Sequence, residues 1–514
     1  MASAHSLSVV ERRLIKGMLM LEPQPTDQSI LAYFTRPGRD LNHARIAEIR
    51  NGWLFPTLPP AMPEEVTAFM AAWVGGGAVD PNSYVTSPGV SVDAEDDDVV
   101  GDRQVGTLRL DWWPVGQGLF ASGIIQGRNG VAVSWVYDCG TVSQQKLIKK
   151  AITRDQTARK RAGASAIKLA VLSHFDKDHI SGFTTLIQTC RIETLLLPYL
   201  PLWQRLVLAI EQGVIADDPA FGFFLDPVGY LRGLGGEIGE ILLVPPSGPD
   251  DAPDAPDDSE GPIEPTVMEG LGGPVEGPLK AERADPPAEA SDDPVLDHQG
   301  SSEAKFLAPG GRLLSPGFWE FVPYNDVTMA ARADAVFVAD ARALAKRLKN
   351  EETERDERLD ELKRLYEAKF KNSKHRNLIS LFLYSGPIGR RFSLAGLAAS
   401  HPVRLPEAFV RFAQVHTGDG TLKQDYWARF RDFYRKGKRL EKAGIVQIMH
   451  HGAAGNSEVG MAARLRPVAS IFSSDPAKGH KHPDAEVLRD FWPYHSIQVD
   501  DAKGFHLSAL LLMR

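Results

Sequence analysis

The segment that most constrains the fold is a short apolar stretch, AIKLAVLS at residues 166–173, which runs directly into HFDKDHISG. A continuous apolar run of this length is typical of a strand buried on both faces of a parallel sheet. Burying polar groups at a strand end costs free energy unless something binds their lone pairs. Because His174, Asp176, Asp178 and His179 follow within six positions, we expect a metal ion at the end of this strand.

Three other strand-like runs end in potential metal ligands. VSWVYDCG supplies Asp138, FAQVHTGDG supplies Asp419, and IVQIMHH supplies His450 and His451. Strand ends on one side of a sheet converge in space, so we expect these distant residues to form a single site. Carboxylates combined with imidazoles suit Zn²⁺ or Mn²⁺, and we predict two such divalent ions as cofactors.

Whole-chain composition limits the class of protein. The chain has 514 residues, 43% of them hydrophobic and 24% charged, which is enough for a large core and more than one domain. A net charge of −8 argues against a generally basic surface, so nucleic-acid contacts must come from local patches. The two cysteines exclude a disulfide framework and fit a reducing cytoplasm. No apolar run approaches about 18 residues, so we expect neither export nor membrane insertion.

Residues 1–80 are predicted to form a small helical domain. Within it, two short helical patterns flank the turn at Pro37 and Gly38, which is compatible with a helix-turn-helix that grips phosphates. The alternative is a helical hairpin packed on the main domain with solvated arginines. The basic side chains of this segment are Arg36, Arg39, Arg45 and Arg50. An acidic linker is expected over residues 81–104.

Residues 105–514 are predicted to form one α/β domain with two insertions. Residues 245–304 are rich in Pro, Asp, Glu and Gly, a composition that predicts disorder. Residues 333–372 combine helical periodicity with mixed charge and predict a long exposed helix or a helical hairpin. A protein partner could bind through this charged helix or through the acidic insertion.

The motif SHFDKDHISG resembles the signature of metallo-β-lactamase-fold hydrolases, in the form found in the C-terminal domain of ComEC-type DNA-uptake proteins. Further matches follow in the family's order and span about residues 105–514: PVGQG at 114–118, YDCG at 137–140, TGD at 417–419, HHGAAGNS at 450–457 and HKHPDAEVL at 480–488. The resemblance does not extend to the membrane part of ComEC. It implies a four-layer αβ/βα sandwich.

The resemblance also implies roles for individual residues. His174 and Asp176 would bind one metal, Asp178 and His179 a second, and Asp419 would bridge both. His450, rather than His451, would complete the second site, while Asp138, His451 and His480 would support the cluster from behind. The resemblance further implies hydrolysis by metal-activated water, with Asp178 positioning or accepting its proton and His482 protonating the leaving oxygen.

One departure from the family pattern concerns the first metal. The family usually supplies a further histidine between the first cluster and the bridging aspartate, and none of His298, His375, His401 and His416 lies in a convincing strand-end motif. The expected activity is that of a nuclease or phosphodiesterase with DNA or RNA as substrate. Two alternatives stay open: a nucleic-acid or nucleotide-binding regulator with a degenerate site, and a hydrolase of small esters, lactams or thioesters.

Overall fold

The computed structural model divides into two units, Met1–Arg103 with Leu394–Ala398, and Gln104–Ser393 with Ala399–Arg514. The residues that the structure describes are 7, 9–21, 25–34, 44–50, 60–74, 103–127, 132–214, 218, 220–254, 279–290, 293–298, 303–315, 319–328, 335–350, 355–369, 380–388, 392–401, 410–477 and 482–513.

The described part of residues 1–80 is helical, as the sequence predicts. It contains α1 (Val9–Met18), α2 (Asp27–Ala32), α3 (Ala44–Arg50) and α4 (Pro63–Val74). Thr26 caps α2, because its Oγ1 accepts a hydrogen bond from the Ser29 amide at 3.1 Å. The apolar faces of the helices share a small core that includes Leu14, Ile30 and Phe69. This unit therefore has a hydrophobic core of its own.

The second unit is a mixed α/β structure built on two sheets, which confirms the expected α/β class. The strand order of the ten-stranded sheet is β13-β18-β1-β2-β3-β4-β5-β6-β9-β8. The strands β1, β2 and β3 pair antiparallel, whereas β3, β4, β5, β6 and β9 run parallel. Their bounds are β1 (Arg103–Trp112), β2 (Ala121–Gly127), β3 (Ala132–Tyr137), β4 (Ile167–Val171), β5 (Ile192–Pro198), β6 (Ile238–Val244), β8 (Arg283–Ala284), β9 (Ala304–Leu307), β13 (Phe392–Ala399) and β18 (Phe505–Met513).

The strand order of the eight-stranded sheet is β17-β16-β15-β14-β12-β11-β10-β7. Here β14 to β17 run parallel, and the remaining neighbours pair antiparallel. The bounds are β7 (Lys280–Ala281), β10 (Leu313–Ser315), β11 (Trp319–Tyr324), β12 (Phe382–Pro387), β14 (Ala413–His416), β15 (Ala443–Gln447), β16 (Ala469–Ser473) and β17 (Ser496–Val499). Each sheet thus contributes a block of parallel strands, whose carboxyl ends are the natural place for a site.

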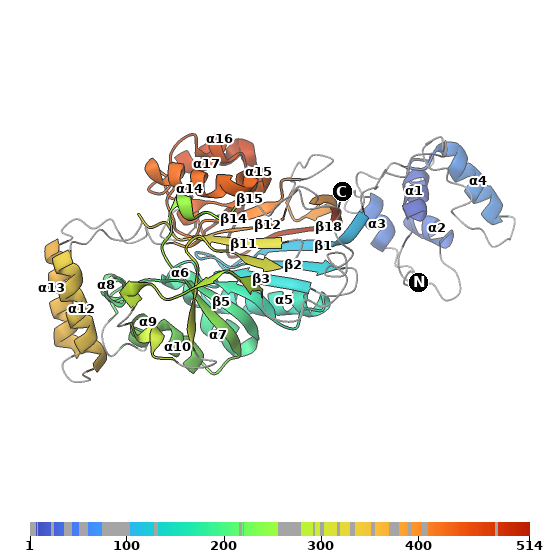
Figure 1. Ribbon diagram of the computed structural model, residues 1–514. Helices are drawn as coiled ribbons and strands as arrows, with labels where there is room; N and C mark the ends of the chain where they lie inside the picture. The colour runs from blue at the N-terminus through green and yellow to red at the C-terminus, as the bar shows by residue number, and fades with distance from the viewer. Residues whose placement is uncertain are drawn as a thin grey trace. The chain divides into compact units, whose positions relative to one another are not determined.

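The two sheets stack face to face, and helices cover both outer faces (Figure 1). Between the sheets, the ring of Trp135 packs against Trp319 and Phe321 at centroid distances of 5.6 and 5.4 Å. The ten-stranded sheet is covered by α5 (Gln145–Arg161), α7 (Phe183–Thr189) and α10 (Pro227–Gly233). The eight-stranded sheet is covered by α14 (Asp425–Arg435), α15 (Arg439–Lys442), α16 (Met461–Leu465) and α17 (Ala485–Phe491).

The remaining elements are short connections or additions to these layers. They are α6 (Lys177–Ile180), α8 (Leu202–Glu211), α9 (Phe221–Leu225), α12 (Ala335–Asn350), α13 (Arg355–Lys369) and the 3₁₀ helices η2 (Pro249–Asp251), η3 (Ala288–Ala290), η4 (Pro294–Leu296), η6 (Lys436–Lys438), η7 (Met449–Gly452) and η8 (Trp492–Tyr494). Within the charged segment 333–372, the described residues form α12 and α13, which pack against each other and on α8 through Phe337, Leu344 and Leu362.

The structure describes part of the segment 245–304, for which the composition predicts disorder, and this part contains η2, β7, β8, η3 and η4. Asp293 is buried and pairs with the guanidinium of Arg205 through two hydrogen bonds of 2.8 and 2.9 Å. A buried bidentate ion pair fixes a chain segment that its composition alone cannot order. Residues 255–278 lie outside the described residues, as do residues 81–102 of the predicted linker, whereas Arg103 and Gln104 already belong to β1.

None of the helices in the described ranges combines the length and the apolar character needed to cross a bilayer.

Candidate metal centre

Four strand ends bring the predicted ligands together. In the ten-stranded sheet, Asp138 follows β3 and His174 lies three residues after the end of β4, which is parallel to β3. In the eight-stranded sheet, Asp419 lies three residues after β14, and the turn η7 with both histidines follows the parallel strand β15. The predicted convergence is therefore found, with one half of the cluster on each sheet.

The first group consists of His174, Asp176 and Asp419. Nε2 of His174 lies 3.7 Å from Asp176 Oδ2 and 3.6 Å from Asp419 Oδ2. The His174 side chain is 5% exposed, and its Nε2 has no hydrogen-bond partner. A buried imidazole nitrogen without a partner is costly, unless it binds a ligand.

The second group consists of Asp178, His179, Asp419 and His451, whose ligand atoms all lie within 4.8 Å of one another. Nε2 of His179 lies 3.1 Å from Asp419 Oδ1, and Nε2 of His451 lies 3.1 Å from Asp178 Oδ2. Neither His179 Nε2 nor Asp419 Oδ1 has a hydrogen bond of good geometry, although both atoms are buried. These atoms are therefore oriented toward a common point rather than toward each other.

Asp419 faces the two groups with different oxygens, which is the geometry of a bridging ligand. Oδ2 lies 3.6 Å from His174 Nε2, and Oδ1 lies 3.1 Å from His179 Nε2. Two atoms bound to one tetrahedral Zn²⁺ at about 2.0–2.1 Å lie about 3.3 Å apart, so the observed separations match ligand pairs around an ion. The residues present fit a pair of divalent ions.

The structure differs from the expected roles of the two adjacent histidines. His451, not His450, belongs to the group of Asp178 and His179. His450 instead places Nε2 3.6 Å from Asp419 Oδ2, the oxygen that also faces His174. Both histidines have positive φ, 44° and 58°, in a turn that sends neighbouring side chains to different sides of Asp419. Such backbone conformations are strained and cluster at functional sites.

Asp138 and Ser173 hold the histidines from behind. Asp138 Oδ2 lies 2.7 Å from His179 Nδ1 and accepts a 2.7 Å hydrogen bond from the Ser173 hydroxyl. The same hydroxyl lies 2.8 Å from His174 Nδ1. Hydrogen bonds at Nδ1 fix the orientation of each ring and leave Nε2 for a metal. His451 is held in the same way, because its Nδ1 bonds to the carbonyl of Ser473.

Burial and neighbouring charges shift the pKa values of His179 and Asp419 in opposite directions. Burial disfavours the imidazolium of His179, but the neighbouring carboxylates of Asp419 and Asp138 outweigh it and raise its pKa well above the usual value. Burial likewise disfavours the Asp419 carboxylate, yet the surrounding histidines lower its pKa well below the usual range. Burial is the main cause of the raised pKa of Asp176. The carboxylates of Asp419 and Asp138 therefore favour a positive charge at His179.

Close backbone approaches explain the glycine-containing motifs. A Cβ at Gly140 would lie 2.4 Å from the backbone carbon of His179, so only glycine lets the YDCG turn reach α6. The amide of Cys139 donates a 2.9 Å hydrogen bond to the His179 carbonyl, and the Leu119 amide bonds to the Asp178 carbonyl at 3.1 Å. The PVGQG and YDCG loops therefore fix the backbone that carries the ligands.

The predicted supporting and catalytic histidines near the H-P motif are only partly described. His480 lies outside the described residues. The ring of His482 lies 5.8 Å from the ring of His450, and its Nδ1 lies 3.8 Å from Asp484 Oδ2. His482 is thus next to the cluster, and its role as an acid stays a prediction.

The structure describes only part of the predicted phosphate-binding arginines. Arg36 and Arg39, and the side chain of Arg45, lie outside the described residues. Arg50 forms an ion pair with Asp27 and donates a hydrogen bond to the Pro25 carbonyl at 3.2 Å. Its guanidinium therefore fastens α3 to the start of α2.

Sequence reasoning missed several polar residues that shape the site. The Gln447 side-chain oxygen accepts hydrogen bonds from the amides of Thr417 and Gly418 at 2.7 and 2.8 Å, which fixes the turn before Asp419. Gln212 donates a 2.7 Å hydrogen bond to Asp176 Oδ1. A usable signal existed for Ser173, which directly precedes His174, and for Gln447, a polar residue inside an apolar strand.

In comparisons with known proteins, neither a family model nor a curated protein matches the chain.

Proposed function

We propose that this protein is a metal-dependent hydrolase of the metallo-β-lactamase type that cleaves phosphodiester bonds. The observation that carries the proposal is a set of buried candidate ligand atoms that come from different strand ends and lack a hydrogen bond: His174 Nε2, His179 Nε2 and Asp419 Oδ1. Leaving such atoms buried without a partner costs free energy that a bound cation would offset. The stacked sheets with helices on both outer faces support the same type of fold.

The residues would divide between two ions as the geometry suggests. His174, Asp176 and Asp419 would hold one ion. His450 would complete this site in place of the further histidine that the family usually supplies and that this chain lacks. Asp178, His179 and His451 would hold the second ion together with Asp419. Divalent ions bound there would supply Lewis acidity toward a phosphoryl oxygen and lower the pKa of water.

The chain's own groups would then orient the reaction. The Asp178 carboxylate, which is 18% exposed, lines the adjacent cavity together with Asp176 and would accept or position the proton of the attacking water. His482, beside His450, would donate a proton to the leaving oxygen. Asp138 and Ser173 would keep the imidazoles in the tautomer that leaves Nε2 free for a ligand.

The choice of phosphodiesters rests on the resemblance of the motifs to the ComEC hydrolase domain. The test is to incubate purified protein with Mn²⁺ or Zn²⁺ and with DNA, RNA, chromogenic phosphodiesters, lactams and thioesters. We expect phosphodiester cleavage that a chelator abolishes. Cleavage only of lactams or thioesters would reassign the substrate, and metal-free protein that binds nucleic acid without cleaving it would favour the regulatory alternative.

A further inference from the structure

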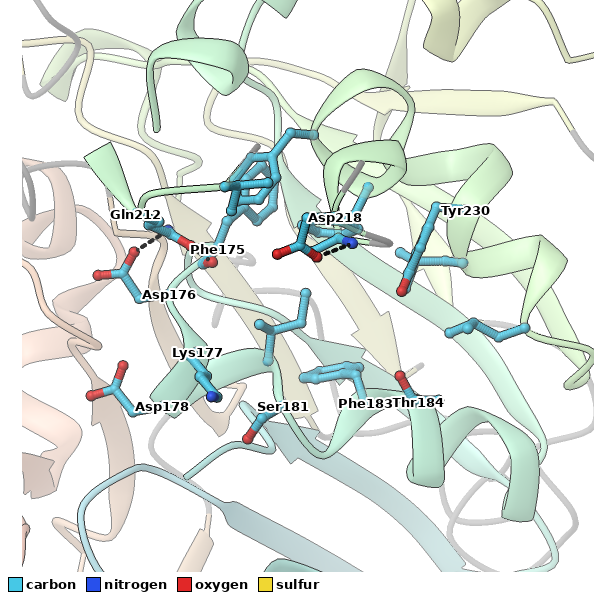
Figure 2. A pocket seen from close by; sticks show the side chains of 17 residues that line it. Phe175, Asp176, Lys177, Asp178, Ser181, Phe183, Thr184, Gln212, Asp218 and Tyr230 are labelled. Carbon is cyan, nitrogen blue, oxygen red and sulfur yellow. Dashed lines mark hydrogen bonds between the residues drawn. The ribbon is translucent and has the colours of Figure 1, made fainter. Parts of the chain in front are cut away.

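A cavity opens directly beside the metal cluster, on the side of Asp176 and Asp178. Its volume is about 630 Å³, within the range of about 300–1,000 Å³ that is typical of small-molecule sites. Figure 2 shows the two carboxylates at one end of the cavity and Tyr230 toward the other. A molecule that fills the cavity would therefore have one end at the metal ligands.

The wall away from the metal ligands is aromatic. Phe223 packs edge-on against Phe175 at a centroid distance of 4.9 Å and against Tyr230 at 5.6 Å, and Phe183 also lines the space. These interlocked rings form a preformed apolar surface for a flat group. They come from two stretches of the chain: the segment before α6 together with α7, and the consecutive helices α9 and α10.

Polar groups interrupt this apolar wall at a few points. Asp218, Thr184 and Ser181 line the cavity, and the Asp218 carboxylate lies between the metal end and Tyr230 in Figure 2. Asp218 Oδ1 accepts a 2.8 Å hydrogen bond from the Ala220 amide, which orients the carboxylate. Lys177 is the one cationic residue among the described lining residues. A planar ring with hydrogen-bonding edges fits this combination better than a purely apolar chain does.

We propose that this cavity binds the nucleobase next to the scissile phosphoester, so that the site acts on unpaired nucleotides. The inference rests on the proposed function and names its substrate class. The base would stack on the aromatic wall, with its edge toward Asp218 and the hydroxyls, and its phosphate would lie at Asp176 and Asp178. Base stacking on aromatic side chains is favourable and tolerant of sequence, whereas a paired base must first leave its duplex at a free-energy cost.

The described end of the segment 245–304 does not line this cavity but supports its aromatic wall from behind. Arg205, paired with the buried Asp293, donates hydrogen bonds of 2.8 Å to the carbonyls of Phe224 and Leu225 at the end of α9. His298 Nε2 lies 2.9 Å from Asp226 Oδ2, at the start of α10. Residues 293–298 therefore brace the two helices that carry the aromatic wall.

The direct test is to measure by calorimetry how tightly adenosine 5′-monophosphate and ribose 5-phosphate bind to the Mn²⁺-loaded protein. We expect the nucleotide to bind at least about tenfold more tightly than the sugar phosphate. Tyr230→Ala, which removes a ring, and Thr184→Trp, which fills the cavity from its exposed edge, should each remove this advantage and leave sugar-phosphate binding unchanged. Thr153→Trp, on the exposed face of α5, is the matched control and should behave as wild type. Equal affinity for both ligands, or a nucleotide advantage that survives Thr184→Trp, would overturn the inference.

Cleavage assays separate this inference from the proposed function. A dinucleotide and a single-stranded oligonucleotide should both be cleaved faster than a duplex that contains the oligonucleotide. The faster of the two shows whether the cavity takes its base from a short nucleotide or from a longer single strand. Phosphodiester cleavage that is faster on duplex would contradict the base cavity but leave the hydrolase proposal standing. Nucleotide binding that depends on Tyr230, without any phosphodiester cleavage, would reject the hydrolase proposal and retain the cavity as a nucleotide site.

Discussion

His179 and His416 are both buried histidines, but their surroundings differ completely. His179 lies among carboxylates, with Asp138 at Nδ1 and Asp419 at Nε2, and its pKa is raised despite burial. His416 lies between the sheets, stacked on Tyr137 at 4.5 Å and on Trp112 at 5.7 Å, and burial lowers its pKa to about 3. Burial alone therefore does not mark a histidine as a candidate ligand, whereas carboxylates beside its ring nitrogens do.

The largest expected effect comes from removing the carboxylate shared by both groups. Asp419→Ala should abolish binding of both ions and lower hydrolysis by about a thousandfold or more, because each group loses its bridging oxygen. Metal content by mass spectrometry of the purified protein checks the first part, and initial rates check the second. Asp432→Ala, on the exposed surface of α14, is the control and should keep both ions. Full metal content in the Asp419 variant would contradict the bridging role.

A smaller effect is expected from the carboxylate behind His179. Asp138→Asn keeps the shape but removes the charge that orients the ring through Nδ1, so metal affinity should fall about 10–100-fold. Competition with a metal-binding dye measures this change. Unaltered affinity would show that the Asp138 contact matters only for folding.

The pH dependence of stability tests the other histidine. The folded-state pKa of His416, about 3, lies below the unfolded value of about 6.5, so the unfolded chain binds its proton first as the pH falls. The contribution of His416 to stability is therefore complete above about pH 6.5 and is lost progressively below it, by about 2 kcal/mol at pH 5. Urea unfolding in the presence of a chelator should show this loss in the wild type and a correspondingly smaller loss in His416→Phe. Equal losses in both proteins would mean that His416 is protonated in the folded state.

The smallest effect concerns the hydroxyl that connects the two ligand histidines. Ser173→Ala removes one hydrogen bond to Asp138 and the contact with His174 Nδ1, while the Ser173 amide still donates to Asp138 at 2.7 Å. We expect about a fivefold loss of metal affinity, equivalent to about 1 kcal/mol. A loss as large as that of Asp138→Asn would indicate that the hydroxyl, not the carboxylate, orients the rings.

The sequence predicts the cluster of candidate ligands because strand ends and the polar residues that follow them are local features. His174 to His179 and Asp419 follow apolar runs, and parallel pairing brings such ends together. The roles of His450 and His451 could not be separated, because they depend on positive φ angles in one turn. Nor could composition reveal that Asp293 meets Arg205, since that contact joins residues 88 positions apart. The aromatic cavity was missed for the same reason.

We propose that two cations share Asp419 between the two sheets. Crystals grown with Mn²⁺ or Zn²⁺ and measured at the metal absorption edge test it directly. We predict two anomalous peaks, one among His174, Asp176 and Asp419 and the other among Asp178, His179 and His451. A map without a peak next to Asp419 would show that this carboxylate does not bridge two ions.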